Sequence, residues 1–225
     1  MPDAASQTAS GDPAGFIRAN TDLIAPPLVP EIDLHLASEA QPIWLATEAD
    51  LDAYGLPPPY WAFAWAGGQA LARYILDHPH EVRGRRVFDF ASGSGIVAIA
   101  AAMAGASAVV ANDIDPFALT AIALNADANG ATIATEPRDL IGAPLAGHDA
   151  VLAGDVCYEQ PMADRTIAWL HERAAADQSV LLGDPGRAYL PKTGMDWVIR
   201  YGILESGPLE DTDARNAIVW RVNAS

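Results

Sequence analysis

The chain has 225 residues, 51% of them hydrophobic and 19% charged, which is enough apolar material for one large domain. Its 29 acidic and 13 basic residues give a formal net charge of −16, which disfavours nucleic-acid partners and suits basic partners or simple solubility. The single cysteine, Cys157, excludes an intrachain disulfide and a zinc site built from cysteines.

Residues 1–12 are small and polar, and we expect them to be flexible. They lack the basic region and apolar core of a signal peptide, and the longest apolar run, Ile96 to Ala111, is too short to cross a bilayer. We therefore expect a cytoplasmic monomer without a membrane partner. Residues 13–64 contain short apolar pieces between prolines and are predicted to form an N-terminal extension that packs on a domain of residues 65–225.

Apolar residues at helical spacing predict a helix from Ala64 to His78, ended by Pro79. Strands and helices then alternate, which predicts an α/β fold with a mostly parallel sheet and helices on both faces. The predicted strands are residues 85–90, 107–113, 131–136, 148–155 and 179–184, and the predicted helices are residues 95–105, 116–129 and 161–176. Residues 196–205 and 214–224 follow without a helix between them, which predicts a hairpin at one edge of the sheet.

A ligand of such a sheet binds beyond the carboxyl ends of the strands. Acidic residues stand at four of these ends: Asp89, Asp113, Asp155 and Asp184. This crevice is therefore the predicted site, and its first and fourth loops are expected to face each other.

The first strand leads into a glycine-rich loop in which Gly93 and Gly95 leave room for a ligand. The spacing alone also suits a dinucleotide site or a plain tight turn. No lysine or arginine lies between Arg86 and Arg138, and Asp89 stands where a pyrophosphate would lie. A carboxylate there favours a ligand with a cationic amine and a sulfonium, which is S-adenosylmethionine (SAM).

The next two loops offer acceptors for the rest of such a cofactor. Asp113 lies 20 positions beyond Gly93, a spacing that suits hydrogen bonds from ribose hydroxyls. Asp115 is predicted to cap the helix that begins at Pro116. Asp139 is a candidate acceptor for the adenine amino group, although a simple loop aspartate explains it nearly as well.

The fourth loop carries Asp155 and Tyr158, which are spaced to line one narrow channel. A lysine that enters it arrives as an ammonium, since its reference pKa is about 10.4. Asp155 can orient that group and Tyr158 can shape the pocket, although Tyr158 can also be a packed aromatic residue. We interpret Cys157 as a small buried residue, and the histidines indicate neither a metal site nor a nucleophile–base pair.

Three motifs together resemble the core of class I methyltransferases with the acid-x-x-Tyr loop of seven-strand protein-lysine methyltransferases: DFASGSG, NDIDP and GDVCYE. Two further motifs, PPYWAFAWAGGQALARYILDHP and LLGDPGR, are similar to the family of the electron transfer flavoprotein beta-subunit lysine methyltransferase. The resemblance covers the chain from about residue 28 to its end.

The resemblance implies a Rossmann-like sheet of seven strands with an antiparallel edge pair, and SAM as the methyl donor. It places the cofactor against the first two loops and the start of the upstream helix, and the target lysine against Asp155 and Tyr158. The implied cofactor-binding residues are Trp65, Gly67, Gly68, Asp89, Ala91, Gly93, Gly95, Asp113, Ile114 and Asp139. Two departures are Ala91, where the family loop has its first glycine, and Ala66, where proline is expected.

The leading hypothesis is a SAM-dependent protein-lysine N-methyltransferase that acts on electron transfer flavoprotein beta subunit, or on another protein such as a ribosomal one. A small-molecule N-methyltransferase for a nicotinamide-like amine is the alternative. A SAM- or nucleotide-binding module without catalysis is the third, and the intact Asp155 and Tyr158 argue against it. Methyl transfer needs a neutral amine, and we expect its proton to leave to water while Asp155 orients the nitrogen.

Overall fold

The computed structural model describes residues 12–38, 41, 43, 58–202 and 216–224. The predicted flexible segment therefore lies outside the described residues, except Asp12, which caps the first helix through a hydrogen bond from the Gly15 amide. In chain order the described elements are α2 (Pro13–Asn20), β1 (Asp22–Ile24), β2 (Leu34–Leu36), η1 (Tyr60–Ala62), α5 (Ala66–Asp77), η2 (Pro79–Glu81), β3 (Arg86–Phe90), α6 (Ile96–Met103), β4 (Ala108–Asn112), α7 (Pro116–Ala128), β5 (Ala134–Glu136), β6 (Ala150–Gly154), α8 (Met162–Ala175), β7 (Ser179–Asp184), β8 (Met195–Gly202) and β9 (Asn216–Val222).

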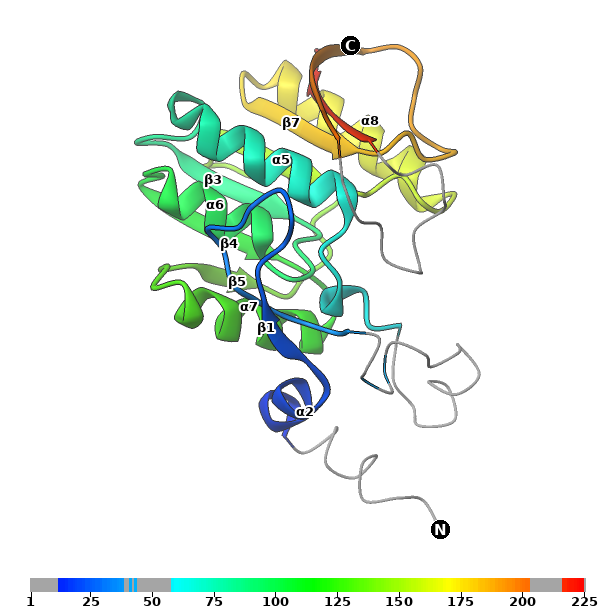
Figure 1. Cartoon of the computed structure of the whole chain (residues 1–225). Coiled ribbons are helices and arrows are strands. Elements are labelled where there is room, and N and C mark those ends of the chain that lie inside the picture. The colour runs from blue at the N-terminus through cyan, green and yellow to red at the C-terminus, as the bar shows by residue number, and fades with distance from the viewer. Residues whose placement is uncertain (1–11, 39–40, 42, 44–57, 203–215, 225) are drawn as a thin grey trace.

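Among the described residues, seven strands form one sheet in the order β5-β4-β3-β6-β7-β9-β8 (Figure 1). The strands from β5 to β7 are parallel, while β9 runs antiparallel to both β7 and β8. The sequence-based expectation of a Rossmann-like α/β sheet with an antiparallel C-terminal edge pair is confirmed.

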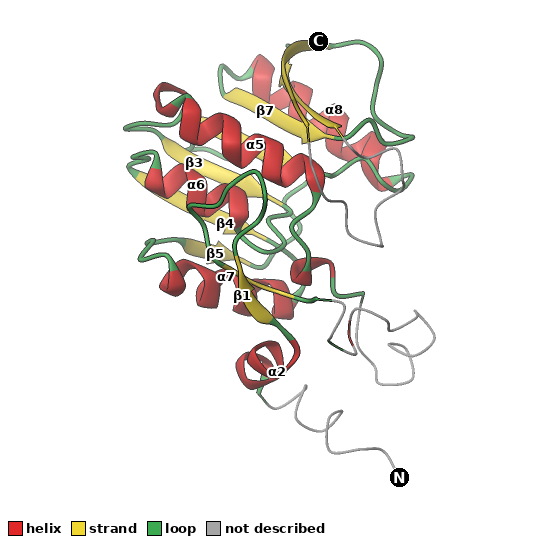
Figure 2. Cartoon of the chain, viewed as in Figure 1, coloured by secondary structure: helices red, strands yellow, loops and turns green. Residues whose placement is uncertain are grey.

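Helices cover both faces of the sheet (Figure 2). Successive residues of a strand point to opposite faces, and in the central strands both sets are apolar. In β6, Leu152 packs with α5 and α6 in one core cluster, whereas Val151 and Ala153 pack with Trp169 of α8 in another. A further cluster joins Ile17 of α2 to α7. In the part of the chain that the structure describes, no helix is long and apolar enough to span a membrane.

Element boundaries differ from the predicted ones where hydrogen bonds of caps and turns decide them. The predicted helix 64–78 begins at Ala66 with Trp65 as its N-cap, and Pro79 starts a separate short 3-10 helix. The predicted strand 131–136 begins only at Ala134, because the Ala131 amide still donates to Ala126 at the end of α7. The outer parts of the predicted edge hairpin, residues 203–205 and 214–215, lie outside the described residues.

The N-terminus of α5 packs on β6 and β7 by backbone-to-backbone contact. A Cβ atom at Gly183 would lie 2.1 Å from the Gly67 oxygen, and one at Gly154 would lie 2.9 Å from the Gly68 Cα. Conversely, a Cβ at Gly67 would lie 2.3 Å from the Gly183 oxygen. Only glycine fits at such approaches, so Gly67, Gly154 and Gly183 set how close the helix comes to the ends of these strands.

We predict that Gly183→Ala lowers the free energy of unfolding by about 2 kcal/mol or more, because the methyl group must push α5 from the sheet. Gly202→Ala is the matched control in β8, where the nearest atom to an added Cβ is 3.9 Å away. Urea unfolding followed by circular dichroism measures both. Equal stability of the two variants would contradict the packing described here.

Candidate active site

The glycine-rich loop between β3 and α6 turns through three left-handed residues. Ala91, Gly93 and Gly95 have φ angles of +51°, +56° and +84°. An added Cβ at Gly93 would meet nothing within 4 Å, whereas one at Gly95 would lie 3.3 Å from Ile122 of α7. Gly93 therefore leaves space beside the loop, and Gly95 allows α6 and α7 to pack closely.

Asp89 points into the protein beneath this loop. Its side chain is 1% exposed and accepts hydrogen bonds from the Ser92 hydroxyl and from the Ala98 amide, the latter at 3.1 Å. Burial raises the pKa of the Asp89 carboxyl to about 7, and the charge of Asp113 adds to this effect. Asp89 therefore braces the loop from inside, and direct contact of Asp89 with the methionine end of SAM stays a prediction.

Asp113 joins the second loop to the first. Its carboxylate accepts from the Gly93 amide at 2.9 Å and from the Asp115 amide at 3.0 Å, and burial raises the pKa of Asp113. Ile114, the next residue, is 71% exposed, so it presents an apolar side chain to the solvent. The predicted cap is confirmed, since Asp115 accepts from the Phe117 amide at 2.8 Å.

Asp139 lies farther out. Its carboxylate accepts from the Ile141 amide at 3.0 Å within a local turn and lies 3.8 Å from Arg165, and both side chains are more than half exposed. These contacts are those of an ordinary aspartate in a loop, and its contact with adenine stays a prediction.

Asp155, directly after β6, forms hydrogen bonds with two other segments, the first turn of α5 and the loop after β7. One carboxylate oxygen accepts from the Gly68 amide at 2.7 Å, and the other accepts from the Arg187 guanidinium at 3.0 Å. The Gly68 amide is among the first helical amides of α5, which have no partner within the helix, and the N-cap Trp65 offers no side-chain bond. Asp155 thus caps α5 from another part of the chain, with a left-handed φ of +57° that aspartate tolerates.

Aromatic rings stand beside this carboxylate. The Arg187 guanidinium lies 5.4 Å from the centre of the Trp65 ring. Tyr60 contacts Trp65 at 6.1 Å and Tyr158 at 5.6 Å between ring centres. Tyr60 and Tyr158 are 46% and 43% exposed, so the three rings form a partly open aromatic wall. Tyr158 is thus linked to Trp65 through Tyr60, and the predicted channel between Asp155 and Tyr158 stays a prediction. The buried position predicted for Cys157 is confirmed.

Several residues that shape the site were not identified from the sequence. Arg187 places a cation in a crevice that was expected to be acidic, and only its position in the GDPGR motif gave a signal. Asn125 donates to the Ser94 carbonyl at 2.8 Å and accepts from the His35 amide at 2.7 Å, which ties the N-terminal segment to the glycine loop. Asn112 donates to the carbonyls of Glu136 and Arg138. These partners lie 24 to 90 positions apart, so no local pattern reveals them.

Comparison with known proteins places the chain in a family. A family model described as ribosomal protein L11 methyltransferase (PrmA) matches residues 70–153. The chain is 37% identical over 226 residues to the electron transfer flavoprotein beta subunit lysine methyltransferase of Danio rerio, which covers 97% of this chain and 86% of that protein. The chain belongs to this methyltransferase family. It is therefore a SAM-dependent enzyme, as the sequence analysis predicts, and the third hypothesis of a non-catalytic module is set aside.

Solved structures agree with this fold. The ribosomal protein L11 methylase from Lactobacillus delbrueckii subsp. bulgaricus has a TM-score of 0.51 and 23% identity, and covers 72% of this chain and 81% of that chain. Magnesium protoporphyrin IX methyltransferase from Synechocystis PCC 6803 with bound SAM also has a TM-score of 0.51, at 17% identity, and covers 79% and 85%. Among the residues of the present chain that the structure describes, no group of three or more His, Cys, Asp or Glu residues is arranged to hold a metal ion.

The pKa of Asp89 predicts how the unliganded enzyme responds to pH. Its folded value of about 7 lies above its ordinary value of 3.8, so the neutral carboxyl stabilises the fold. This stability is fully present below about pH 4 and is lost as the pH rises through about 7. Between about pH 6 and about pH 8 the wild type should lose roughly 1.4 kcal/mol relative to Asp89→Asn, measured by urea unfolding. Identical pH dependence of the two proteins would contradict the assignment.

Ala91 offers a second test, because its left-handed conformation disfavours any side chain with a Cβ. Ala91→Gly should raise the free energy of unfolding by about 0.5–1 kcal/mol, after allowance for the greater freedom of glycine in the unfolded chain. Ala102→Gly in α6 is the opposite control and should lower it by about 1 kcal/mol. A loss of stability in both variants would show that Ala91 is not strained.

Proposed function

We propose that this enzyme methylates a lysine side chain of the beta subunit of electron transfer flavoprotein. Two observations support the substrate. The relative from Danio rerio bears that activity in its name, and its alignment covers 97% of this chain. The second observation carries the proposal of a lysine as the methyl acceptor. Asp155 and an aromatic wall of Tyr60, Trp65 and Tyr158 lie at one point of the crevice.

The first two loops suit a cofactor that carries positive charge. SAM supplies a methyl group bonded to a sulfonium. The open side of Gly93 gives its backbone room to approach the cofactor, and Asp113 offers a carboxylate for ribose hydroxyls. The exposed apolar side chain of Ile114 suits the flat face of an adenine ring. These roles, like those of Trp65, Gly67 and Gly68 above the cofactor, belong to the proposal.

The second half of the crevice suits a long, narrow amine. An aromatic wall can contact the methylene groups of a lysine, and ring faces also attract a cationic head group. One oxygen of the Asp155 carboxylate accepts from the Gly68 amide and the other from two nitrogens of Arg187, and we propose that this carboxylate also accepts a hydrogen bond from the amine. The side chain of lysine therefore fits the proposed acceptor channel in shape and in polarity.

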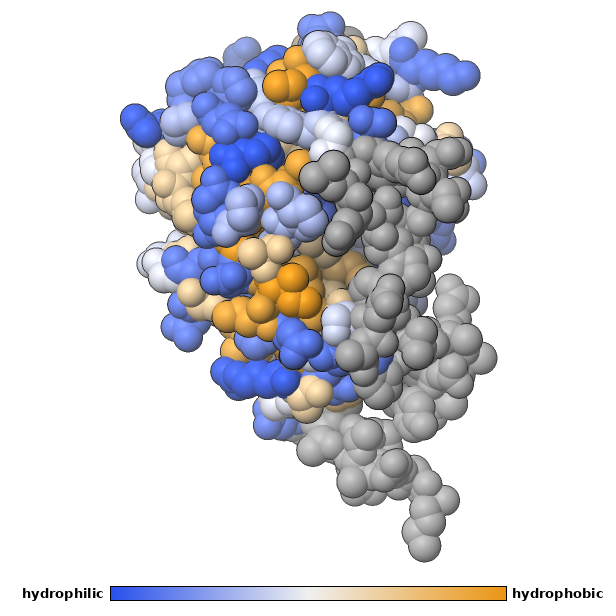
Figure 3. Space-filling model, in the orientation of Figure 1, coloured by the Kyte–Doolittle hydropathy of each residue, from blue (hydrophilic) through white to orange (hydrophobic). Residues whose placement is uncertain are grey.

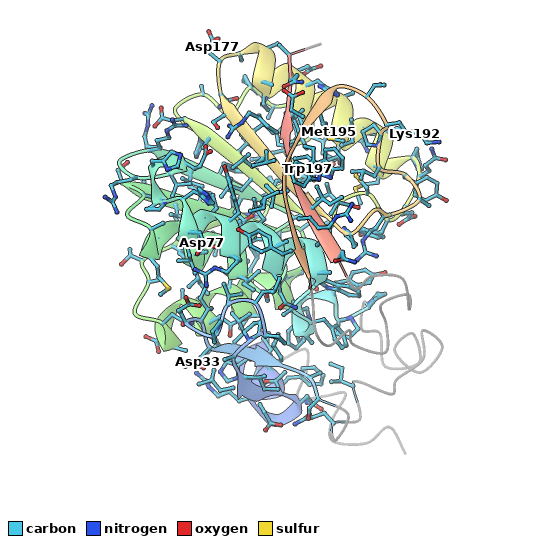
Figure 4. All side chains as sticks on the ribbon, turned by 45° about the horizontal axis from the view of Figure 1, so that its top comes forward. Asp33, Asp77, Asp177, Lys192, Met195 and Trp197 are labelled. Carbon is cyan, nitrogen blue, oxygen red and sulfur yellow. The ribbon has the colours of Figure 1, made fainter. Side chains whose placement is uncertain are left out.

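The surface suits a basic protein partner. Hydrophilic residues surround apolar ones on the face shown in Figure 3, and the net charge of −16 favours encounter with positively charged regions. Asp33, Asp77 and Asp177 lie on the outside of the molecule (Figure 4). Lys192, the only lysine of the chain, is exposed in the connection between β7 and β8 (Figure 4). A monomeric state, a cytoplasmic location and the lack of nucleic-acid or membrane partners stay predictions.

The direct test incubates the purified enzyme with methyl-labelled SAM and, separately, with the flavoprotein beta subunit, ribosomal protein L11 and nicotinamide. We expect label only in the beta subunit, with mass spectrometry locating it on lysine. Transfer to L11 or to nicotinamide alone would replace the proposed substrate with one of the other two.

Asp155→Asn tests the acceptor channel with little change of shape, because the amide keeps an oxygen for the Gly68 N–H. We expect kcat to fall at least about tenfold, a loss of roughly 1.4 kcal/mol or more in transition-state stabilisation. The dissociation constant for SAM should change little by calorimetry. Glu159→Gln, the same chemical change at an exposed position of the same loop, is the matched control. Equal turnover of both variants would remove Asp155 from the mechanism.

A further inference from the structure

Arg187 is held firmly beside the acceptor channel. The amides of Gly186 and Arg187 both donate to Asp184 at 2.7 Å, and Asp184 is fully buried at the end of β7. The guanidinium then reaches the Asp155 carboxylate with two nitrogens, at 3.0 and 3.3 Å, and lies over Trp65. A short, anchored loop thus fixes a positive charge next to the only carboxylate assigned to the methyl acceptor.

An isolated carboxylate in that position would work against the reaction. A negative charge close to an amine favours the protonated form, which raises the pKa of the amine above its usual value. An ammonium has no lone pair and cannot attack the methyl group. Because Asp155 is only 8% exposed, solvent screens its charge poorly, so another charge must balance it.

We propose that Arg187 is a positioning residue that neutralises Asp155, so that the target lysine reacts as a neutral amine. This inference rests on the proposed function and adds a role for the β7–β8 connection. The N–H bond of the ammonium breaks first and the proton leaves to water. The freed lone pair then forms the N–C bond to the methyl carbon, while the C–S bond breaks and its electron pair stays on sulfur.

Two titratable residues of the loop that carries Asp155 keep their protons in the pH range of the test. Burial raises the pKa of Cys157 to about 12 and also raises the pKa of Tyr158, so both stay neutral near pH 8. The remaining charged or titratable groups that act on Asp155, Cys157 or Tyr158 are Asp184, Tyr60, Glu159 and Asp113. Asp89, with a pKa of about 7, also titrates in this range, but it is the same in all variants. A difference between variants in the rise of kcat with pH therefore reports on the substrate amine.

The test compares the pH dependence of kcat for wild type, Arg187→Lys, Arg187→Met and the double variant Asp155→Asn/Arg187→Met, with the beta subunit as substrate. The acidic limb is the rise of kcat with pH as the amine loses its proton. In Arg187→Met the midpoint of this rise should move up by about one pH unit, which means about tenfold less neutral amine at a fixed lower pH. Arg187→Lys, which keeps the charge, should resemble the wild type. The double variant removes both charges and should bring the midpoint back toward that of the wild type.

A lower kcat with an unchanged midpoint in Arg187→Met would overturn the proposal and leave Arg187 a structural role only. Calorimetric binding of S-adenosylhomocysteine shows that each variant is folded. The role of Arg187 is tested independently of the protein substrate with n-butylamine as a probe, by its binding to the complex of the enzyme with S-adenosylhomocysteine. Wild type should prefer the neutral amine, so its affinity should rise with pH, and Arg187→Met should gain affinity for the ammonium at neutral pH. If the wild type fails to methylate the beta subunit yet shows this difference, only the substrate assignment falls.

Discussion

The site depends on how closely the first turn of α5 approaches the ends of β6 and β7. A helix normally packs on a sheet through the side chains of both, but here Gly67 lies directly against Gly183, and Gly68 against Gly154. This approach brings the Gly68 amide to 2.7 Å from the Asp155 carboxylate. A charged acceptor at a helix N-terminus satisfies an amide that has no helical partner and also interacts favourably with the helix dipole.

The same carboxylate organises the substrate side of the crevice. Through Gly68 it fixes Trp65, the residue before α5, and through Arg187 it fixes the connection after β7. Trp65 in turn donates from its indole nitrogen to the Tyr60 carbonyl at 2.8 Å, which continues the aromatic wall. Separate loops are therefore held by one buried charge, and the cofactor side is held in a similar way by Asp113 and the Gly93 amide. A methyl transfer that depends on alignment needs such fixed walls.

The sequence predicted the features that local patterns determine. The order of strands and helices follows from the alternation of apolar runs, and the Asp115 cap follows from its place before Pro116. The sites at the strand ends follow from the topology of parallel sheets. What could not be predicted depends on contacts across the chain: the cap that Asp155 provides lies 87 positions from Gly68, and Arg187 lies 32 positions from Asp155. The inward orientation of Asp89 also escaped prediction, because a residue at the end of a strand can face either side.

Asp155 holds the first turn of α5, and hydrogen exchange at the Gly68 amide measures this contact. Nuclear magnetic resonance of the wild type should show a Gly68 amide that is protected from exchange, although no residue within α5 can accept its hydrogen. In Asp155→Ala that protection should disappear while amides in the middle of α5 remain protected. Exchange of Gly68 at the rate of an unprotected amide in the wild type would show that the carboxylate does not hold the helix.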